Sequence, residues 1–196
     1  MTDHSRRSTD DHGHDVIDPL YVGIVTVSSS RAAEAGDGTE PDDPGGDTIQ
    51  DCFEVEDHEI RERLLVRDDY ASIRSAVRGL VARRDIDVVI TTGGTGVTAD
   101  DVSPEATSAL FERELPGFGE LFRMLSWEEV GTRALASRAT AGIASDTPVF
   151  CLPGSTNACR TACEQLIVPE APHLAGLATK HRTNLEEATL SAYDGS

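Results

Sequence analysis

Lysine is almost absent from this chain. Of the 196 residues, 17 are lysine or arginine and 35 are aspartate or glutamate; Lys180 is the only lysine, and the formal net charge is −18. Proteins that bind nucleic acids nonspecifically do so largely by neutralising phosphates with lysine and arginine. We therefore expect no nucleic-acid partner.

The same imbalance indicates a high-salt environment. Molar salt shortens the Debye length to about 3 Å, so many like charges can coexist on one surface. An acidic, lysine-poor surface resembles those of proteins from extreme halophiles. We expect the source to be a halophilic archaeon; the alternative is an acidic protein of a mesophile.

Long hydrophobic runs are also missing. None approaches the roughly 20 apolar residues of a membrane-spanning helix, and the N-terminus lacks the apolar segment of a secretory signal. We expect a cytoplasmic protein with no membrane partner. A chain of 196 residues suits one buried core. We expect one domain over residues 19–179, a disordered acidic, histidine-containing tail over 1–18, and a second tail over 180–196.

Metal-binding and disulfide frameworks are missing as well. The four cysteines form no Cys-x-x-Cys pair, and we expect buried thiols rather than ligands or redox groups. Cys159 and Cys163 are four residues apart, which places them on one face of an expected helix. The tail histidines His4, His12 and His14 could bind a metal, but their irregular spacing favours simple solvation.

Strand-like and helix-like stretches alternate along the rest of the chain. The run over 21–27 is nearly all β-branched or apolar, as in strands covered on both faces. Charged residues interrupt the run over 60–66, which favours an edge strand. Further strands are expected over 86–92 and 147–152, and helices near 45–56, 70–81, 118–125, 130–142 and after 156. This order predicts a three-layer α/β fold, a mostly parallel sheet flanked by helices on both faces.

Small, hydroxylic or acidic residues follow every expected strand. In such sheets ligands bind at the carboxyl ends of the strands, so these segments are expected to meet in one site. In chain order they are Ser28 to Arg31, Asp68 and Asp69, Gly93 to Gly96, and Pro153 to Thr156.

The glycine turn alone leaves its role open. Gly93-Gly94-Thr95-Gly96 lacks the Gly-Lys-Ser/Thr ending of an NTPase phosphate loop and the spacing of a dinucleotide fold. It is either a tight turn or an anion site that binds phosphate through backbone N–H groups. Asp68, Asp100 and Asp101 would repel phosphate unless a cation such as Mg²⁺ lay between them. Helix capping is the alternative, commoner role for Asp68 and Asp101.

Several ordered blocks resemble the MoaB/MogA family of molybdenum-cofactor biosynthesis proteins, and more closely its MoaB branch. The similarity extends over roughly residues 21–177. The blocks that carry it are Thr91 to Gly96, Asp101 to Thr107, Pro116 to Glu120, Phe122 to Ser126, Ser137 to Ala139, and Leu152 to Thr156.

The resemblance implies an activity and a set of site residues. Family members adenylylate molybdopterin: its terminal phosphate attacks the α-phosphorus of Mg-ATP and expels pyrophosphate. The family's functional aspartates fall on Asp68 and Asp101, the expected ligands of Mg²⁺. The resemblance further implies trimers or hexamers and a downstream metal-insertion protein as a partner. The nucleotide and pterin sites would be lined by Gly93, Gly94, Thr95, Gly96, Ser103, Glu105, Pro153, Gly154, Ser155, Ser28 and Arg31.

The chemistry suits these residues, although the chain departs from the family pattern at three places: Asp100, Ser28 to Ser30 where a Ser-Asp step is common, and Arg67 where proline is common. A phosphate monoester has its second pKa near 6 and needs no strong base at neutral pH, so we expect Asp68 and Asp101 to bind metal and position substrates. His58 and His173 are then structural. The family often has arginine directly before the second aspartate, where this chain has Asp100. The alternative is therefore a non-catalytic molybdopterin-binding or scaffold protein of the same pathway.

Overall fold

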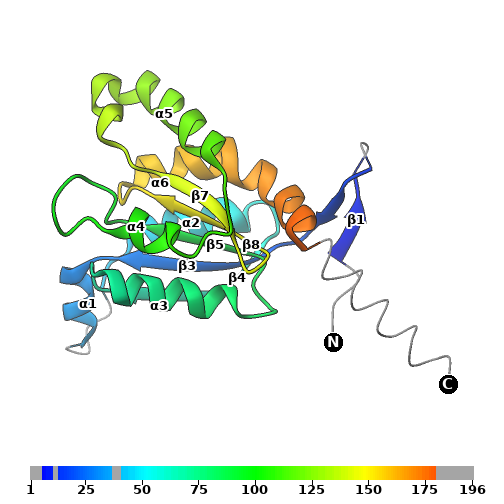
Figure 1. Ribbon diagram of the computed structural model, residues 1–196, viewed down its shortest axis with the longest axis horizontal. Helices are drawn as coiled ribbons and strands as arrows, with labels where there is room; N and C mark the ends of the chain where they lie inside the picture. Colours follow the sequence, from blue (N-terminus) through cyan, green and yellow to red (C-terminus); the bar gives the residue numbers. More distant parts are fainter. Residues whose placement is uncertain (1–5, 11–12, 37–40, 180–196) are drawn as a thin grey trace.

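The computed structural model describes residues 6–10, 13–36 and 41–179, and its centre is a six-stranded sheet of order β4-β3-β5-β8-β7-β6 (Figure 1). The first four strands in this order run parallel; β7 pairs antiparallel with β8, and β6 pairs antiparallel with β7. This mixed α/β sheet confirms the predicted fold class. The strands are β3 (Tyr21–Val27), β4 (Glu59–Val66), β5 (Val88–Thr92), β6 (Arg113–Glu114), β7 (Thr140–Ala144) and β8 (Thr147–Leu152).

Helices cover both faces of the sheet (Figure 1). One layer contains α2 (Pro44–Glu54), α5 (Pro116–Val130) and α6 (Thr156–Ala162), which continues through the π-helical turn η3 (Cys163–Ile167) into a helix over 168–179. The other layer contains α3 (Tyr70–Val81) and α4 (Ser103–Ser108). Strand β4 lies at one edge and alternates between exposed and partly buried residues, which confirms the predicted edge strand.

Each face of the sheet has its own hydrophobic core, and β3 supplies both. Val22 and Ile24 belong to the core under α2, α5 and α6, whereas Val25 and Val27 belong to the core under α3. Successive strand side chains point to opposite faces, so the apolar run of β3 serves two layers. Burial of one such side chain stabilises the fold by roughly 1.5–3 kcal/mol.

One helix was not predicted, and one predicted helix does not form. Helix α1 (Ser29–Gly36) follows β3, where no helix was expected, whereas α2 begins at Pro44, close to its expected start, with Asp43 as its N-cap. Alanine and glutamate favour helix in α1. The helix expected over 130–142 does not form: α5 ends at Val130, and Gly131, with φ of +59°, redirects the chain. A 3₁₀ turn, η2 (Gly131–Ala136), leads into β7, which pairs with β8.

The N-terminal segment is more ordered than expected. Strands β1 (Arg7–Thr9) and β2 (Asp15–Ile17) form an antiparallel hairpin, and Ile17 is buried in the core. Arg6 forms an ion pair with Asp87, 2.5 Å between Nη1 and Oδ2. The expected disorder over residues 1–18 is therefore wrong for residues 6–10 and 13–18, which the structure describes. The tail expected over 180–196 lies outside the described residues. No helix among the described residues is long and apolar enough to cross a membrane.

Candidate functional site

The turn after β5 has glycine at two positions where the backbone conformation disfavours any other residue. Gly93 and Gly94 have φ of +102° and +63°, in the region that side chains disfavour. A Cβ on Gly93 would collide with the backbone carbonyl oxygen of Val27, and the Gly93 N–H donates to the Leu152 carbonyl at 3.0 Å. The turn is therefore wedged between the carboxyl ends of β3 and β8.

A cleft of about 450 Å³ opens beside this turn. Its walls come from the glycine loop, from the start of α6, and from α5 with η2. The predicted residues that line it are Gly93, Gly94, Thr95, Gly96, Asp101, Pro153, Gly154 and Ser155. The lining residues that sequence reasoning did not assign are Phe122, Ser126, Glu129, Val130, Arg133, Ala134, Ala136, Ser137, Asn157 and Ala158.

Two features of the cleft wall can attract an anion, although Asp101 and Glu129 also line the cleft. Ser155 is the N-cap of α6 and accepts the Ala158 N–H at 3.3 Å, so the positive end of the helix dipole lies at the cleft wall. Arg133 is the only basic side chain among the described lining residues, and it is exposed. The sequence offered some indication of the unassigned lining residues, because Ser137 and Phe122 belong to the blocks that carry the family resemblance.

Asp68 lies behind the glycine turn rather than in the lining of the cleft. Its Oδ1 is buried and has no hydrogen-bond partner among the described residues. A Cβ on Gly94 would lie 2.6 Å from this oxygen. Burial, and then the charge of Asp101 and other nearby carboxylates, raises the pKa of Asp68 above its ordinary value. The carboxylate is thus held where a cation would stabilise it.

The capping alternative fails for both aspartates. Asp69, not Asp68, is the N-cap of α3 and accepts the Ser72 N–H at 2.9 Å. Helix α4 has Val102 at its N-cap position, with no side-chain capping bond. Asp101 instead accepts the N–H and hydroxyl of Thr98, at 2.9 and 2.6 Å. These bonds lower the pKa of Asp101, which stays ionised.

Arg138 braces the segment that carries Asp101. Its Nε donates to the Gly96 carbonyl at 2.7 Å, and its two terminal nitrogens donate to the Asp101 carbonyl and to the Glu105 carboxylate. The guanidinium thereby fixes both ends of the 96–101 segment. Sequence reasoning missed this role.

The remaining predicted residues lie around this centre without lining the cleft. Ser103 Oγ is buried beside Gly94 and has no hydrogen-bond partner in the described ranges. Glu105 is exposed and paired with Arg138. Ser28 follows β3 and donates its N–H to the Val66 carbonyl at 2.9 Å. Arg31 lies in α1, with its backbone N–H 3.5 Å from Ser28 Oγ.

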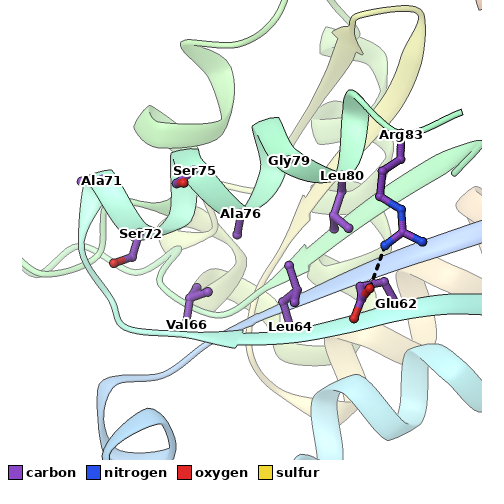
Figure 2. Close-up of a pocket in the computed structure, with 10 residues that line it drawn as sticks. All are labelled: Glu62, Leu64, Val66, Ala71, Ser72, Ser75, Ala76, Gly79, Leu80 and Arg83. Carbon is purple, nitrogen blue, oxygen red and sulfur yellow. Dashed lines mark hydrogen bonds and ion pairs between the residues drawn. The ribbon is translucent and has the colours of Figure 1, made fainter.

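A larger groove of about 680 Å³ lies elsewhere, between β4 and α3 (Figure 2). Leu64 and Val66 face Ala76 and Leu80 across it. Its charged residues, Glu62 and Arg83, pair with each other at 2.7 Å. The groove offers no convergent set of catalytic groups, so we place the functional site at the glycine turn.

All four cysteines are buried, as expected, and none forms a disulfide. Burial raises the pKa of Cys151 and of Cys159 to about 11, so both thiols stay protonated at neutral pH. His58 is buried and accepts the Leu20 N–H at 3.2 Å, a structural contact.

Fold and cleft together define an α/β protein with a cleft, lined by a glycine turn and a helix N-terminus, at the carboxyl ends of its parallel strands. A family model described as "Probable molybdopterin binding domain" matches residues 23–173. "Molybdenum cofactor biosynthesis protein B" of Escherichia coli K12 is 45% identical over 152 residues, 78% of this chain and 85% of the relative. The chain therefore belongs to the MoaB/MogA family of molybdenum-cofactor biosynthesis proteins.

Solved structures agree with this assignment. A crystal structure of a molybdenum cofactor biosynthesis protein B superposes with a TM-score of 0.76 at 40% identity, covering 82% of this chain and 96% of the other. The tungsten cofactor synthesizing protein MoaB from Pyrococcus furiosus superposes with a TM-score of 0.71 at 36% identity, covering 82% and 98%.

Proposed function

We propose that this protein is a molybdopterin adenylyltransferase of molybdenum or tungsten cofactor biosynthesis. The observation that carries the proposal is the orphaned, buried Oδ1 of Asp68, which lies beside Gly94 and within the electrostatic influence of Asp101. A buried carboxylate oxygen without a partner is costly unless it has a ligand. Its position behind a glycine-lined anion cleft supports a ligand that pairs carboxylates with phosphates.

Mg²⁺ fits these residues. It prefers oxygen ligands and binds through one or two carboxylates together with phosphate oxygens and water. Asp68 offers the unpartnered Oδ1, and the hydrogen bonds from Thr98 use Oδ2 of Asp101. The two aspartates would hold the ion, which when bound would neutralise the charge that develops on the transferring phosphoryl group.

The remaining work of the site is positioning. An oxygen of the terminal phosphate of molybdopterin forms a bond to the α-phosphorus of ATP. The bond between that phosphorus and the oxygen that bridges it to the β-phosphorus breaks, and pyrophosphate leaves. Backbone N–H groups of the glycine loop and of the α6 N-terminus would bind phosphate oxygens, and Arg133 would add a positive charge at the mouth. The nucleophile is already ionised near neutral pH, so no general base is required.

A pyrophosphate assay tests the proposal. The full chain, in molar salt, is incubated with molybdopterin and Mg-ATP, and we expect pyrophosphate release that requires all three components. Omission of molybdopterin controls for simple ATP hydrolysis. Folded protein that releases no pyrophosphate would contradict the proposal.

A non-catalytic pterin-binding or scaffold protein is the second candidate. The observation that favours it is Asp100, which is exposed at the position where the family resemblance leads us to expect arginine. Binding of molybdopterin that is tight and unaffected by ATP, without turnover, would support this candidate. We propose a cytoplasmic location for either function, with the downstream metal-insertion protein as a partner that receives the pterin.

We expect a homo-oligomer, a trimer or hexamer. Large apolar side chains are exposed at every third position of α5: Leu121 at 50%, Met124 at 67%, Trp127 at 56% and Val130 at 46%. These four side chains form an apolar stripe that winds around α5, and large exposed apolar side chains gathered on one element mark an interaction surface. Met124→Glu combined with Trp127→Glu is expected to lower the mass measured by sedimentation to that of a monomer.

A matched control for the oligomer is Val55→Glu. Val55 is 78% exposed but lies at the end of α2, away from this stripe. It should leave the mass unchanged. A wild-type chain that sediments as a monomer in molar salt would contradict the prediction.

Salt dependence is a separate expectation. With a net charge of −18, mutual repulsion disfavours the folded state unless salt screens it. We expect the circular dichroism signal of the folded chain, and its activity, to fall as potassium chloride is diluted from molar to millimolar concentration. Full structure and activity in dilute buffer would show that the halophilic interpretation is wrong.

A further inference from the structure

A cluster of metal-ligating side chains lies where the N-terminal hairpin meets the C-terminal helix. Asp10 and His14 close the turn between β1 and β2: the Asp10 N–H donates to the His14 carbonyl at 2.9 Å, and the His14 N–H donates to Asp10 Oδ1 at 2.8 Å. His173 comes from the helix over 168–179. One ligand atom from each of the three residues lies within 4.8 Å of the others.

The two imidazoles face each other through their nitrogens. His173 Nε2 lies 3.0 Å from His14 Nδ1, the ring centroids are 5.0 Å apart, and the ring planes differ by 7°. Tetrahedral zinc with bonds of about 2.0–2.1 Å places two ring nitrogens roughly 3.3 Å apart. A small rotation of the half-exposed His14 ring would therefore admit the ion.

Glu170 prepares His173 for this role. Its Oε1 lies 2.7 Å from His173 Nδ1, one helical turn away. A proton on Nδ1 that is donated to this carboxylate leaves the lone pair on Nε2, the nitrogen that faces His14. The same carboxylate–histidine arrangement orients zinc-bound histidines and raises their basicity.

The hairpin and the helix are held together independently of the cluster. Gly176 lies so close to the backbone of Asp15 that a Cβ would collide with its carbonyl oxygen. Arg7 Nη1 donates to the Gly176 carbonyl at 3.4 Å, and Ile17 anchors β2 in the core. The ligands therefore come from two elements whose spacing is already fixed, which favours metal binding.

From this geometry we infer that Asp10, His14 and His173 form a Zn²⁺ site that fastens the hairpin to the C-terminal helix. Two imidazoles and one carboxylate suit zinc better than the oxygen-seeking Mg²⁺ or Ca²⁺, and water completes the tetrahedron. The hairpin adjoins the amino end of β3, opposite the strand ends that form the cleft (Figure 1). The site is structural, and it does not depend on the proposed adenylyl transfer.

Zinc titration of the metal-free full chain, in the salt that keeps it folded, tests the site. We expect a single equivalent to bind. His14→Ala and His173→Ala should each weaken binding by about tenfold or more, and Glu170→Gln by about 10- to 100-fold through loss of the supporting carboxylate. Glu164→Gln is the matched control, because Glu164 lies in the same continuous helical segment and pairs with Arg160 instead; it should bind zinc as the wild type does.

Two further measurements separate this site from the cysteines and from the cleft. The Co²⁺-loaded protein should show no thiolate-to-metal charge-transfer band. Zinc should slow amide exchange of residues 15–17 in the wild type but not in His14→Ala, because binding stabilises the state in which the hairpin is docked. No stoichiometric zinc, unchanged binding in a His14→Ala/His173→Ala double variant, or a thiolate band would overturn the inference, whatever the pyrophosphate assay shows.

Discussion

Asparagine in place of Asp101 is expected to reduce pyrophosphate release by at least about tenfold, because the site loses a negative metal ligand while its geometry is kept. Asparagine can still accept the Thr98 hydrogen bonds that hold this side chain. Asp68→Asn should have a comparable effect, because its buried Oδ1 is the unpartnered ligand atom. Steady-state rates at several Mg²⁺ concentrations measure both, and raised Mg²⁺ should recover part of the lost rate.

Each aspartate has a matched control next to it in the sequence. Asp100→Asn removes an exposed carboxylate and should leave the rate near that of the wild type. Asp69→Asn keeps the N-cap of α3, since asparagine caps as well as aspartate. Equal losses at Asp100 and Asp101 would mean that net charge, rather than a metal ligand, sets the rate.

Loss of activity in Asp68→Asn should not come from unfolding. Burial and the neighbouring carboxylates raise the pKa of Asp68 in the folded state. The protonated carboxyl of Asp68 therefore stabilises the folded state relative to the ionised form. This stabilisation is complete below the pKa that Asp68 has in the unfolded chain, and it is lost as pH rises through its higher pKa in the folded chain. At neutral pH the ionised side chain opposes folding, so the asparagine variant should be at least as stable as the wild type. A chemical denaturation curve at pH 7 checks this.

Gly93→Ala is expected to destabilise the fold by roughly 2–5 kcal/mol, through a strained positive φ together with overpacking. The backbone carbonyl of Val27 lies where the new methyl group would go, and backbone at the end of a central strand cannot move aside cheaply. Displacement of the turn would also move the cleft wall, so residual activity should be low even under stabilising salt. Denaturation midpoints and pyrophosphate rates measure the two effects.

Gly79→Ala is the matched control for this substitution. Gly79 lies in the interior of α3 with open space where a Cβ would project. Alanine there should stabilise the fold by about 0.5–1 kcal/mol, because it lowers the entropy of the unfolded chain and favours helix. A Gly93→Ala variant as stable as the wild type would refute the steric argument for the turn.

Local patterns predicted the central part of the fold. The strand over 147–152 was placed correctly, because a continuous apolar run bounded by turn residues describes a buried strand. The meeting of the four strand ends followed from the alternation of strands and helices. The sequence could not show that Asp69, rather than the adjacent Asp68, caps α3, because that choice depends on where the helix begins.

Elements that depend on distant partners were missed. Thr140 to Ala144 is rich in small residues and reads as helix, but it becomes strand β7 by pairing with β8 and β6. The N-terminal hairpin has no apolar period of its own and is fixed by contacts with Asp87 and Gly176. Arg133 and Asn157 meet at the cleft only because the turn after α5 lies beside the start of α6.

The hydrogen bonds of Arg138 determine which positions near the site can change in sequence without moving Asp101. Arg138 holds the carbonyls of Gly96 and Asp101, while residues 97–100 between them are exposed. Substitutions in that short span can change the charge at the rim of the site without displacing the Asp101 carboxylate. Asp100 lies in this span, so its exposed carboxylate can be exchanged for a neutral or basic side chain while the framework stays intact.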